Sequence, residues 1–360
     1  MLFAFASSML ITWDAIPRII RVVNSRKLKD KPGKHKIHKQ EIPTLGGIGI
    51  FAAFSFGFLF AVTGHMPEVT YFMAALLILF FIGVKDDLIY LNPKKKLLVE
   101  IVAALIIVLF IDLHFTSIHG IFRLYAISAW VSYIITVFLI VLIINAYNLI
   151  DGIDGLAASV GIIASATFGF WFWLSDDYGY AIMAAALLGS LLVFMGYNLS
   201  SGPNKIFMGD TGSLIVGFIL AVFAVRFNEL NASSTANYQL VSSPAISIAI
   251  LIVPLFDMLR IITLRLYHRL PLFEADNRHL HHLFLRAGLS HRRSTAYIAS
   301  LNIALISLAF LLDGLGIVIL CFILLGICLA VTKILLIAVK KRESVLSDNG
   351  LIVDEEGHKA

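Results

Sequence analysis

The sequence predicts an all-α, polytopic helical integral membrane protein with about eleven transmembrane helices. Of its 360 residues, 59% are hydrophobic and only 14% are charged. Apolar runs of more than about 18 residues recur along the chain, which is the length that a bilayer-spanning helix needs. These runs are continuous, whereas the strands of a membrane barrel alternate in short segments. We therefore exclude both a β-barrel and a soluble globular core.

The apolar runs define the predicted spans in order. They lie at residues 2–23, 44–63, 69–84, 97–112, 129–147, 156–174, 180–197, 211–227, 244–266, 295–313 and 315–339. The first run lacks a basic start and is interrupted by Asp14, Pro17 and Arg18, so we expect a retained helix and not a cleaved signal peptide.

The distribution of basic residues predicts the orientation, because Lys and Arg accumulate on the cytoplasmic side. If the spans alternate, only Arg123 and Arg226 of the 28 Lys and Arg residues lie toward the face opposite the basic loops. We expect the N-terminus outside and the C-terminus in the cytoplasm. The net charge of +5 then forms a basic cytoplasmic rim that suits anionic headgroups and phosphorylated ligands. We expect no nucleic-acid partner, because no soluble segment is large enough to bind one.

Acidic residues lie at the ends of several predicted spans, namely Asp86, Asp87, Asp151, Asp154 and Asp210. Membrane proteins tolerate carboxylates so near hydrocarbon where they are paired, bound to metal or facing water. The alternation of spans puts all five on the cytoplasmic side, together with the His-rich stretch that begins at Arg278. This convergence predicts one aqueous site at a membrane face.

The adjacent acids Asp86 and Asp87 end the third span and precede Asn92-Pro93 and three lysines. Two neighbouring carboxylates are not both easily ionised unless a cation lies beside them. A hard divalent ion such as Mg²⁺ suits them, since it takes a few carboxylates and completes its shell with water or phosphate oxygens. The alternative is helix capping combined with ordinary interfacial charge.

In the run that ends at Gly155, polar residues recur at every third position: Asn145, Asn148, Asp151 and Asp154. Wherever the helix persists, this spacing places their side chains on one face. Glycines between the acids leave the backbone open to a bulky ligand. A polar helix end that satisfies loop backbone groups is the alternative.

Two further stretches complete the pattern. In Asn204 to Ser213, a lone acid, Asp210, lies between glycines where a helix begins. The helix dipole alone would favour an acid there, but free N–H groups also suit a phosphate oxygen or a metal bound to one. The loop from 276 to 293 supplies imidazoles and guanidiniums. Its histidines lack the usual zinc spacing, so we interpret them as phosphate or pyrophosphate contacts.

Together these motifs resemble the polyprenyl-phosphate N-acetylhexosamine-1-phosphate transferases. The resemblance covers nearly the whole chain, in order: Lys36-Ile-His38 and the following Pro43-Thr44, Asp86-Asp87 with Asn-Pro-Lys, Asn148 to Gly155, Phe207 to Ser213, and the HLHH motif at 279–282. HLHH is similar to the branch that uses UDP-N-acetylglucosamine, whereas the muramyl-pentapeptide branch has three consecutive histidines. In the UDP-N-acetylglucosamine branch, many members carry Arg just before the Lys-x-His of the first loop, where this chain has His35.

The resemblance implies transfer of N-acetylglucosamine-1-phosphate from UDP-GlcNAc to undecaprenyl phosphate, giving undecaprenyl-pyrophosphate-GlcNAc and UMP. It also implies a Mg²⁺ cofactor, with Mn²⁺ as the alternative, and a role as the first membrane step of an O-antigen, common-antigen or teichoic-acid polysaccharide. Attack by the lipid phosphate is expected to be direct, because that phosphate is already an adequate nucleophile once it is positioned. A covalent intermediate on an aspartate stays open.

The expected roles follow from the resemblance. The catalytic residues are Asp86, Asp87, Asp151 and Asp154, and the metal ligands are Asp210, Asp86 and Asp87. The nucleotide-sugar contacts are Asn148, Asp151, Asp154, Asn204, Lys205, His279, His281 and His282. The lipid-phosphate and pyrophosphate contacts are Lys36, His38, Thr44, Lys96, Arg292 and Arg293.

We interpret residues 1–342 as one transmembrane catalytic domain with cytoplasmic active-site loops at 24–43, 85–96, 148–155, 198–211 and 267–294. Residues 343–360 are expected to be a short, disordered cytoplasmic tail. The implied location is the bacterial inner membrane. The face from Ala184 to Gly189 is a candidate helix-packing surface for a homodimer. The alternatives are the muramoyl-pentapeptide transferase of the same family and an anion transporter, which would need acids such as Asp14 or Asp257 within its spans.

Overall fold

The structure is a computed structural model that describes residues 1–26, 29–30, 42–89, 91–120, 126–233, 238–271 and 278–348. The predicted phosphate contacts Lys36 and His38 lie outside these residues. The first half of the described chain contains α1 (Leu2–Arg26), β1 (Lys29–Asp30), β2 (Ile42–Pro43), α2 (Gly46–Ala61), α3 (Val69–Leu88), α4 (Pro93–Phe110), α5 (Ala129–Leu149) and α6 (Leu156–Leu174). The second half contains α7 (Tyr178–Asn198), α8 (Gly209–Ala232), α9 (Ser243–Ile250), α10 (Ile252–His268), α11 (Leu280–Arg286), α12 (His291–Leu311), the 3₁₀ turn η2 (Asp313–Leu315) and α13 (Ile317–Asp348).

The predicted all-α membrane class is confirmed. Among the described residues, eight helices are long and apolar enough to cross a bilayer, or nine if α9 and α10 count as one broken span. The two strands form only a short antiparallel ribbon, in which Lys29 lies opposite Pro43 and Asp30 opposite Ile42. The chain is therefore a multi-pass helical membrane protein.

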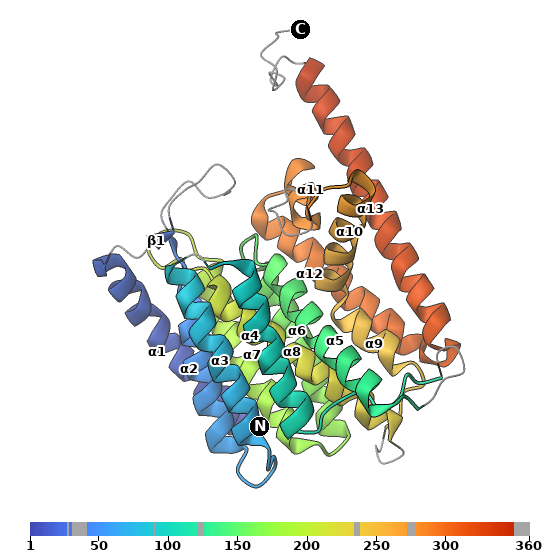
Figure 1. Cartoon of the computed structure of the whole chain (residues 1–360). Helices are drawn as coiled ribbons and strands as arrows, with labels where there is room; N and C mark the ends of the chain where they lie inside the picture. Colours follow the sequence, from blue (N-terminus) through green and yellow to red (C-terminus); the bar gives the residue numbers. More distant parts are fainter. Residues whose placement is uncertain are drawn as a thin grey trace.

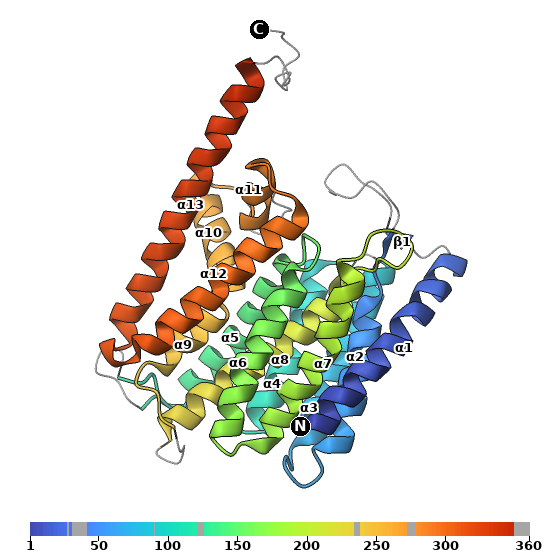
Figure 2. The same ribbon diagram turned by 180° about the vertical axis from the view of Figure 1, so that it is seen from behind.

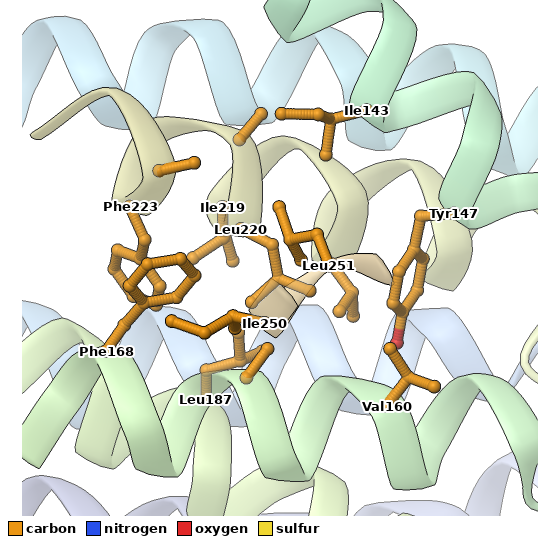
Figure 3. Packing of buried hydrophobic residues seen from close by; sticks show 14 of the residues in the cluster. Ile143, Tyr147, Val160, Phe168, Leu187, Ile219, Leu220, Phe223, Ile250 and Leu251 are labelled. Atoms are coloured by element: carbon orange, nitrogen blue, oxygen red, sulfur yellow. The ribbon is translucent and has the colours of Figure 1, made fainter. Parts of the chain in front are cut away.

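The bundle is organised around α8, whose sequence is apolar on every side. Within its most apolar window, 83% of the residues are buried, more than in any other membrane-length helix described. It packs against α2, α3, α5, α6 and α9. Figure 3 shows part of this packing, where Phe223 of α8 lies beside Phe168 of α6 with ring centroids 6.1 Å apart. A helix that is apolar all round belongs at the centre of such an assembly.

The loops that carry the predicted site lie at one end of the bundle. In Figures 1 and 2, β1 and α11 lie at the end opposite the N-terminus, and α13 leans outward from the rest of the bundle. Helices α3, α5 and α7 end toward that side, and α4, α6 and α8 begin there. Three predicted active-site loops are therefore brought to a common face by the alternation of the chain.

The predicted ninth span, 244–266, is wrong as a single straight helix. The chain breaks at Leu251, where α9 and α10 meet at an angle of 84°. Pro254 explains the break, because proline has no N–H to donate to the carbonyl four residues earlier and its ring clashes there. Asn302 of α12 donates to the carbonyls at the break: its amide nitrogen lies 3.4 Å from the freed Ile250 O and 3.2 Å from Ala249 O.

Two other expectations need correction. The face from Ala184 to Gly189 packs inside the protein: a Cβ on Gly189 would lie 2.4 Å from Phe5 O of α1, and Ala184 lies against Gly169 of α6. These residues therefore offer no surface to a second copy. The tail also begins later than predicted, since α13 continues to Asp348 and Glu343 is held 2.7 Å from Arg286 of α11.

We predict that Asn302→Leu, which has the same branched shape, lowers the free energy of unfolding by about 1–3 kcal/mol. The Ile250 carbonyl would lose its donor while remaining buried, whereas the Ala249 carbonyl would still accept from the Leu251 N–H. Thermal unfolding of the purified protein measures the effect, with Ile303→Val on the exposed side of the same helix as the control. An unchanged unfolding temperature for the Asn302 variant would contradict the assignment.

Candidate active site

The start of α8 is capped by a carboxylate that comes from α3. Asp87 Oδ1 accepts a hydrogen bond from the Asp210 N–H at 2.7 Å, and Asp87 Oδ2 accepts from the Thr211 N–H at 3.0 Å and from the Thr211 hydroxyl. The first N–H groups of a helix have no partner within the helix and carry partial positive charge. Asp87 supplies both the acceptors and the opposite charge, which fixes the position of its neighbour Asp210.

Glycines allow the backbones to approach closely enough for this contact. A Cβ on Gly83, one turn before Asp87, would lie 2.5 Å from Thr211 Cα. Gly209 has a φ of +72°, and a Cβ there would lie 2.1 Å from the Thr44 carbonyl oxygen. Thr44, one of the predicted phosphate contacts, therefore borders the start of α8 through its backbone.

Asp210 lies at the centre of a polar network. Its Oδ1 accepts hydrogen bonds from Lys96 Nζ of α4 and, at 2.7 Å, from Asn148 Nδ2 of α5. Asn148 also donates to Ser213 Oγ at 2.6 Å. Lys96 Nζ lies 3.2 Å from Asp86 Oδ2, so one ammonium joins the two acids. The side chain of Asp210 is 36% exposed and that of Asp86 only 9%, which leaves Asp210 the more accessible to a ligand.

The turn between α5 and α6 adds two acids with different surroundings. Burial raises the pKa of Asp151 well above its usual value, and the charges of Asp210 and Asp87 raise it further. Burial also raises the pKa of Asp154, but hydrogen bonds and charges from His291 and Lys205 outweigh that effect and lower the pKa overall. Asp154 Oδ2 lies 2.6 Å from Lys205 Nζ and 3.3 Å from His291 Nδ1. The convergence of five carboxylates predicted from the sequence is confirmed.

The histidine motif packs onto the same turn. His281 is buried, and its ring lies against Gly152, where a Cβ would be 2.4 Å from Nε2. Burial, with a smaller contribution from the neighbouring histidines, lowers the pKa of His281 to about 3. It is therefore a neutral imidazole at pH 7. His282 lies beside it, with ring centroids 4.3 Å apart.

Asp257 anchors this motif. Its Oδ2 lies 2.8 Å from His279 Nδ1, and its Oδ1 accepts from the Leu280 N–H at 2.7 Å. A carboxylate on one ring nitrogen fixes the orientation of the imidazole. Asp257 is near the start of α10, just after the break, so the break positions the histidines.

The other predicted contacts lie farther out. Arg292 donates to the Leu199 carbonyl at 2.7 Å, which ties the start of α12 to the loop that precedes α8. Arg293 and Asn204 are exposed. Lys205 is engaged with Asp154 and lies over the Phe207 ring at 5.5 Å. The structure thus places Asn204, Arg292 and Arg293 at the rim, whereas Lys96 and Asn148 contact Asp210 directly.

Several residues of the network were not predicted. Thr211 and Ser213 belong to the recognised motif but had no role, and Asp257 had been considered only for transport. Glu100 was overlooked, although an acid four residues after Lys96 in an apolar run is a visible signal. Its Oε2 accepts a hydrogen bond from Asn145, the first residue of the repeating polar pattern.

The side chains of the site can be compared with the ligands that Mg²⁺ prefers. Among the described residues, no group of three or more His, Cys, Asp or Glu side chains has the geometry to hold a metal ion. Mg²⁺ is commonly held by one or two carboxylates plus substrate phosphates and water, so Asp210 with Asp86 suits it if a phosphate completes the shell. Asp87 is less suited as a ligand, because its oxygens accept three hydrogen bonds from α8, whereas Asp86 accepts one from the Leu91 N–H at 2.8 Å and is otherwise paired with Lys96.

Comparisons with known proteins find relatives that cover most of the chain. A protein of Bacillus subtilis (strain 168), named as a probable undecaprenyl-phosphate N-acetylglucosaminyl 1-phosphate transferase, is 31% identical over 296 residues, which is 82% of this chain and 80% of the relative. The undecaprenyl-phosphate alpha-N-acetylglucosaminyl 1-phosphate transferase of Escherichia coli (strain K12) is 29% identical, over 81% of this chain and 78% of its own. That of Yersinia pestis is 27% identical over 84% of both.

The family model described as "Glycosyl transferase family 4" matches residues 69–228. This range runs from the start of α3 almost to the end of α8. It contains all five carboxylates together with Lys96 and Asn148. The chain therefore belongs to glycosyl transferase family 4.

Proposed function

We propose that this protein transfers N-acetylglucosamine-1-phosphate from UDP-GlcNAc to undecaprenyl phosphate, giving undecaprenyl-pyrophosphate-GlcNAc and UMP. The observation that carries the proposal is the network in which Asp210, fixed by Asp87, contacts Lys96 and Asn148 at one end of a membrane bundle. The names of the relatives, which cover about four fifths of the chain, support the same reaction.

In this reaction an oxygen of the lipid phosphate attacks the β-phosphorus of UDP-GlcNAc. A new P–O bond forms, and the bond from the β-phosphorus to the oxygen that bridges to the α-phosphorus breaks. UMP leaves with that electron pair. The chain has to hold two anionic phosphates in line and stabilise the charge that develops, because little covalent chemistry is required of the protein in phosphoryl transfer.

Asp210 and Asp86 are proposed to hold Mg²⁺, which would neutralise charge on the pyrophosphate and on the departing UMP when bound. Asp87 then acts by positioning Asp210, since its own oxygens are engaged with α8. Those engaged oxygens also make Asp87 a poor nucleophile, which supports direct displacement over a covalent intermediate.

The donor is proposed to lie over the turn between α5 and α6, against Asn148, Asp151 and the neutral His281. Basic groups around this turn would then bind phosphate oxygens. The further contacts proposed are Asp154, Asn204, Lys205, His279 and His282 for the nucleotide sugar, and Lys36, His38, Thr44, Lys96, Arg292 and Arg293 for the lipid phosphate and pyrophosphate.

The proposed membrane arrangement has eleven spans. These are the nine membrane-length helices, with α9 and α10 counted as one, plus the shorter α2 and the more polar α4. With the N-terminus outside, the site faces the cytoplasm, where UDP-sugars occur, and the membrane is the bacterial inner membrane. Asp14 is paired with Arg18 at 2.6 Å on an exposed helix face, and Asp257 holds His279, so neither acid supports transport.

The direct experiment is incubation of the purified protein with undecaprenyl phosphate and a panel of UDP-sugars, with Mg²⁺ or with EDTA. We expect label from UDP-GlcNAc to enter the lipid extract with release of UMP, and only when Mg²⁺ is present. UDP-GalNAc and UDP-MurNAc-pentapeptide serve as competing donors. Transfer from either of these in preference to UDP-GlcNAc would overturn the proposed donor, and the absence of any transfer would overturn the reaction.

Replacing Asp210 and Asp87 in turn should distinguish the proposed metal ligand from the cap of α8. Asp210→Asn keeps the volume and can still accept from Asn148, so we expect near-normal stability but a loss of activity of about 10²–10³-fold, typical of removing an electrostatic stabiliser. Asp87→Asn removes a charged cap, so we expect about 1–2 kcal/mol of lost stability in addition to lower activity.

Activity and thermal unfolding are measured on both variants, with Asp14→Asn on the exposed face of α1 as the control. Full activity and unchanged Mg²⁺ dependence in Asp210→Asn would rule out Asp210 as a ligand.

A further inference from the structure

Glu100 is a buried acid with an incomplete set of partners. Its side chain is fully buried within α4. Oε2 accepts a hydrogen bond from Asn145 Nδ2, and Asn145 is itself held by a second bond to the Val141 carbonyl at 2.9 Å. The other oxygen, Oε1, is buried and has no hydrogen-bond partner in the part of the chain that the structure describes. Such an acceptor is costly at membrane depth, so its retention calls for a partner that reaches it in some state of the protein.

Lys96 is the cation that can reach it. It lies four residues earlier on the same helix, a spacing that places two side chains on one face. The charges of Lys96 and of Asp210 both act on the Glu100 carboxylate. Lys96 itself contacts Asp210 and Asp86 and is 14% exposed. One flexible ammonium is therefore within reach of three carboxylates, and one of these has a free buried acceptor.

A divalent cation at Asp210 would disturb this arrangement. An ammonium and a divalent cation repel strongly when both lie against one carboxylate, particularly at a partly buried site. Lys96 would have to leave Asp210 Oδ1. Its four-carbon stem allows such a movement without a change of backbone. Glu100 Oε1 is the acceptor on the same helix face that has no hydrogen bond to lose.

We propose that Glu100 is a positioning residue that accepts the Lys96 ammonium when a divalent cation binds Asp210. Glu100 thereby keeps Lys96 inside the site and paired, beside the position where substrate phosphate is bound, and lowers the cost of admitting the cation. The proposal rests on the metal site of the proposed function. It concerns an exchange of partners by Lys96 and assigns no contact between Glu100 and substrate.

The exchange is tested by cation binding in the absence of substrates. The full-length protein in detergent is titrated with Mn²⁺, and free Mn²⁺ is measured by its electron paramagnetic resonance signal, with Mg²⁺ as competitor. The variants are Glu100→Gln, Lys96→Met and the double variant. Gln keeps a carbonyl oxygen for Asn145 but cannot receive an ammonium as a charged partner. Glu229→Gln is the matched control, because Glu229 is a partly buried acid that binds Thr116 outside the site.

We expect Glu100→Gln to weaken Mn²⁺ binding about tenfold, a coupling of the size seen between residues in contact. Lys96→Met should tighten binding, because the competing ammonium is gone. In the Lys96→Met background, Glu100→Gln should then change the affinity by less than about twofold. Glu229→Gln should leave it unchanged.

Three results would overturn the proposal. Equal weakening by Glu100→Gln with and without Lys96 would show that Glu100 acts only through its own charge. Unchanged affinity in Lys96→Met would show that Lys96 does not compete with the cation, and this result can be read even if Glu100→Gln fails to fold. If the unsubstituted protein does not bind Mn²⁺, no cation displaces Lys96 from Asp210 and the proposal fails.

The transfer assay keeps this proposal separate from the proposed function. Transfer with additive effects of the two variants on Mn²⁺ affinity leaves the reaction standing and rejects the role of Glu100. Coupled effects without transfer support the exchange of partners and reject the reaction.

Discussion

The structure depends on one interaction, the capping of α8 by Asp87. The N-terminus of α8 lies within the bundle, between α2 and α3, where water cannot readily satisfy its first N–H groups. A carboxylate from α3 satisfies two of them and also binds the Thr211 hydroxyl. Hydrogen bonds to charged groups contribute about 1.5–3 kcal/mol each. This contact fixes the register of the two helices, and it places Asp210 where it contacts Lys96 and Asn148.

The five aspartates of the site have different roles because their surroundings differ. Asp87 is engaged with backbone, and Asp154 is paired with Lys205 and His291, so both hold elements together. Asp210 shares Lys96 with Asp86 and keeps part of its side chain exposed. Asp151 lies among the others, and its raised pKa reflects burial in an excess of negative charge. Such an excess is unfavourable for folding. The excess of negative charge attracts a cation. That cation and the surrounding basic groups offset the negative charge, so that anionic substrates can bind.

Much of this could be predicted from the sequence because each inference rested on a local pattern. The length of the apolar runs locates the helices, and alternation forces the loops at Asp87, Asp151 and Asp210 to one face. Features set by tertiary contacts were missed. That Asp87 caps a helix over a hundred residues away has no local signature. Pro254 did signal a break, but the apolar composition on either side concealed it. The small residues from Ala184 to Gly189 indicate close packing without specifying that the partner is α1 or α6 of the same chain.

The break between α9 and α10 has a consequence for the site that alternation alone would not provide. In a straight ninth span, Asp257 would lie on a helix that runs along the bundle axis like its neighbours. The turn of 84° at Leu251 redirects α10, and Asp257 follows the break by less than two helical turns. There it holds both His279 and the first N–H of α11. The histidines are thereby set against Gly152 by an acid whose position depends on a proline and on Asn302 of α12. Because α10, α11 and α12 all contribute, the histidine side of the site is assembled from the C-terminal part of the chain and docked onto the carboxylate side. Rigid placement of His281 then requires the histidine side and the carboxylate side to be packed together. The geometry of the site therefore depends on the break between α9 and α10.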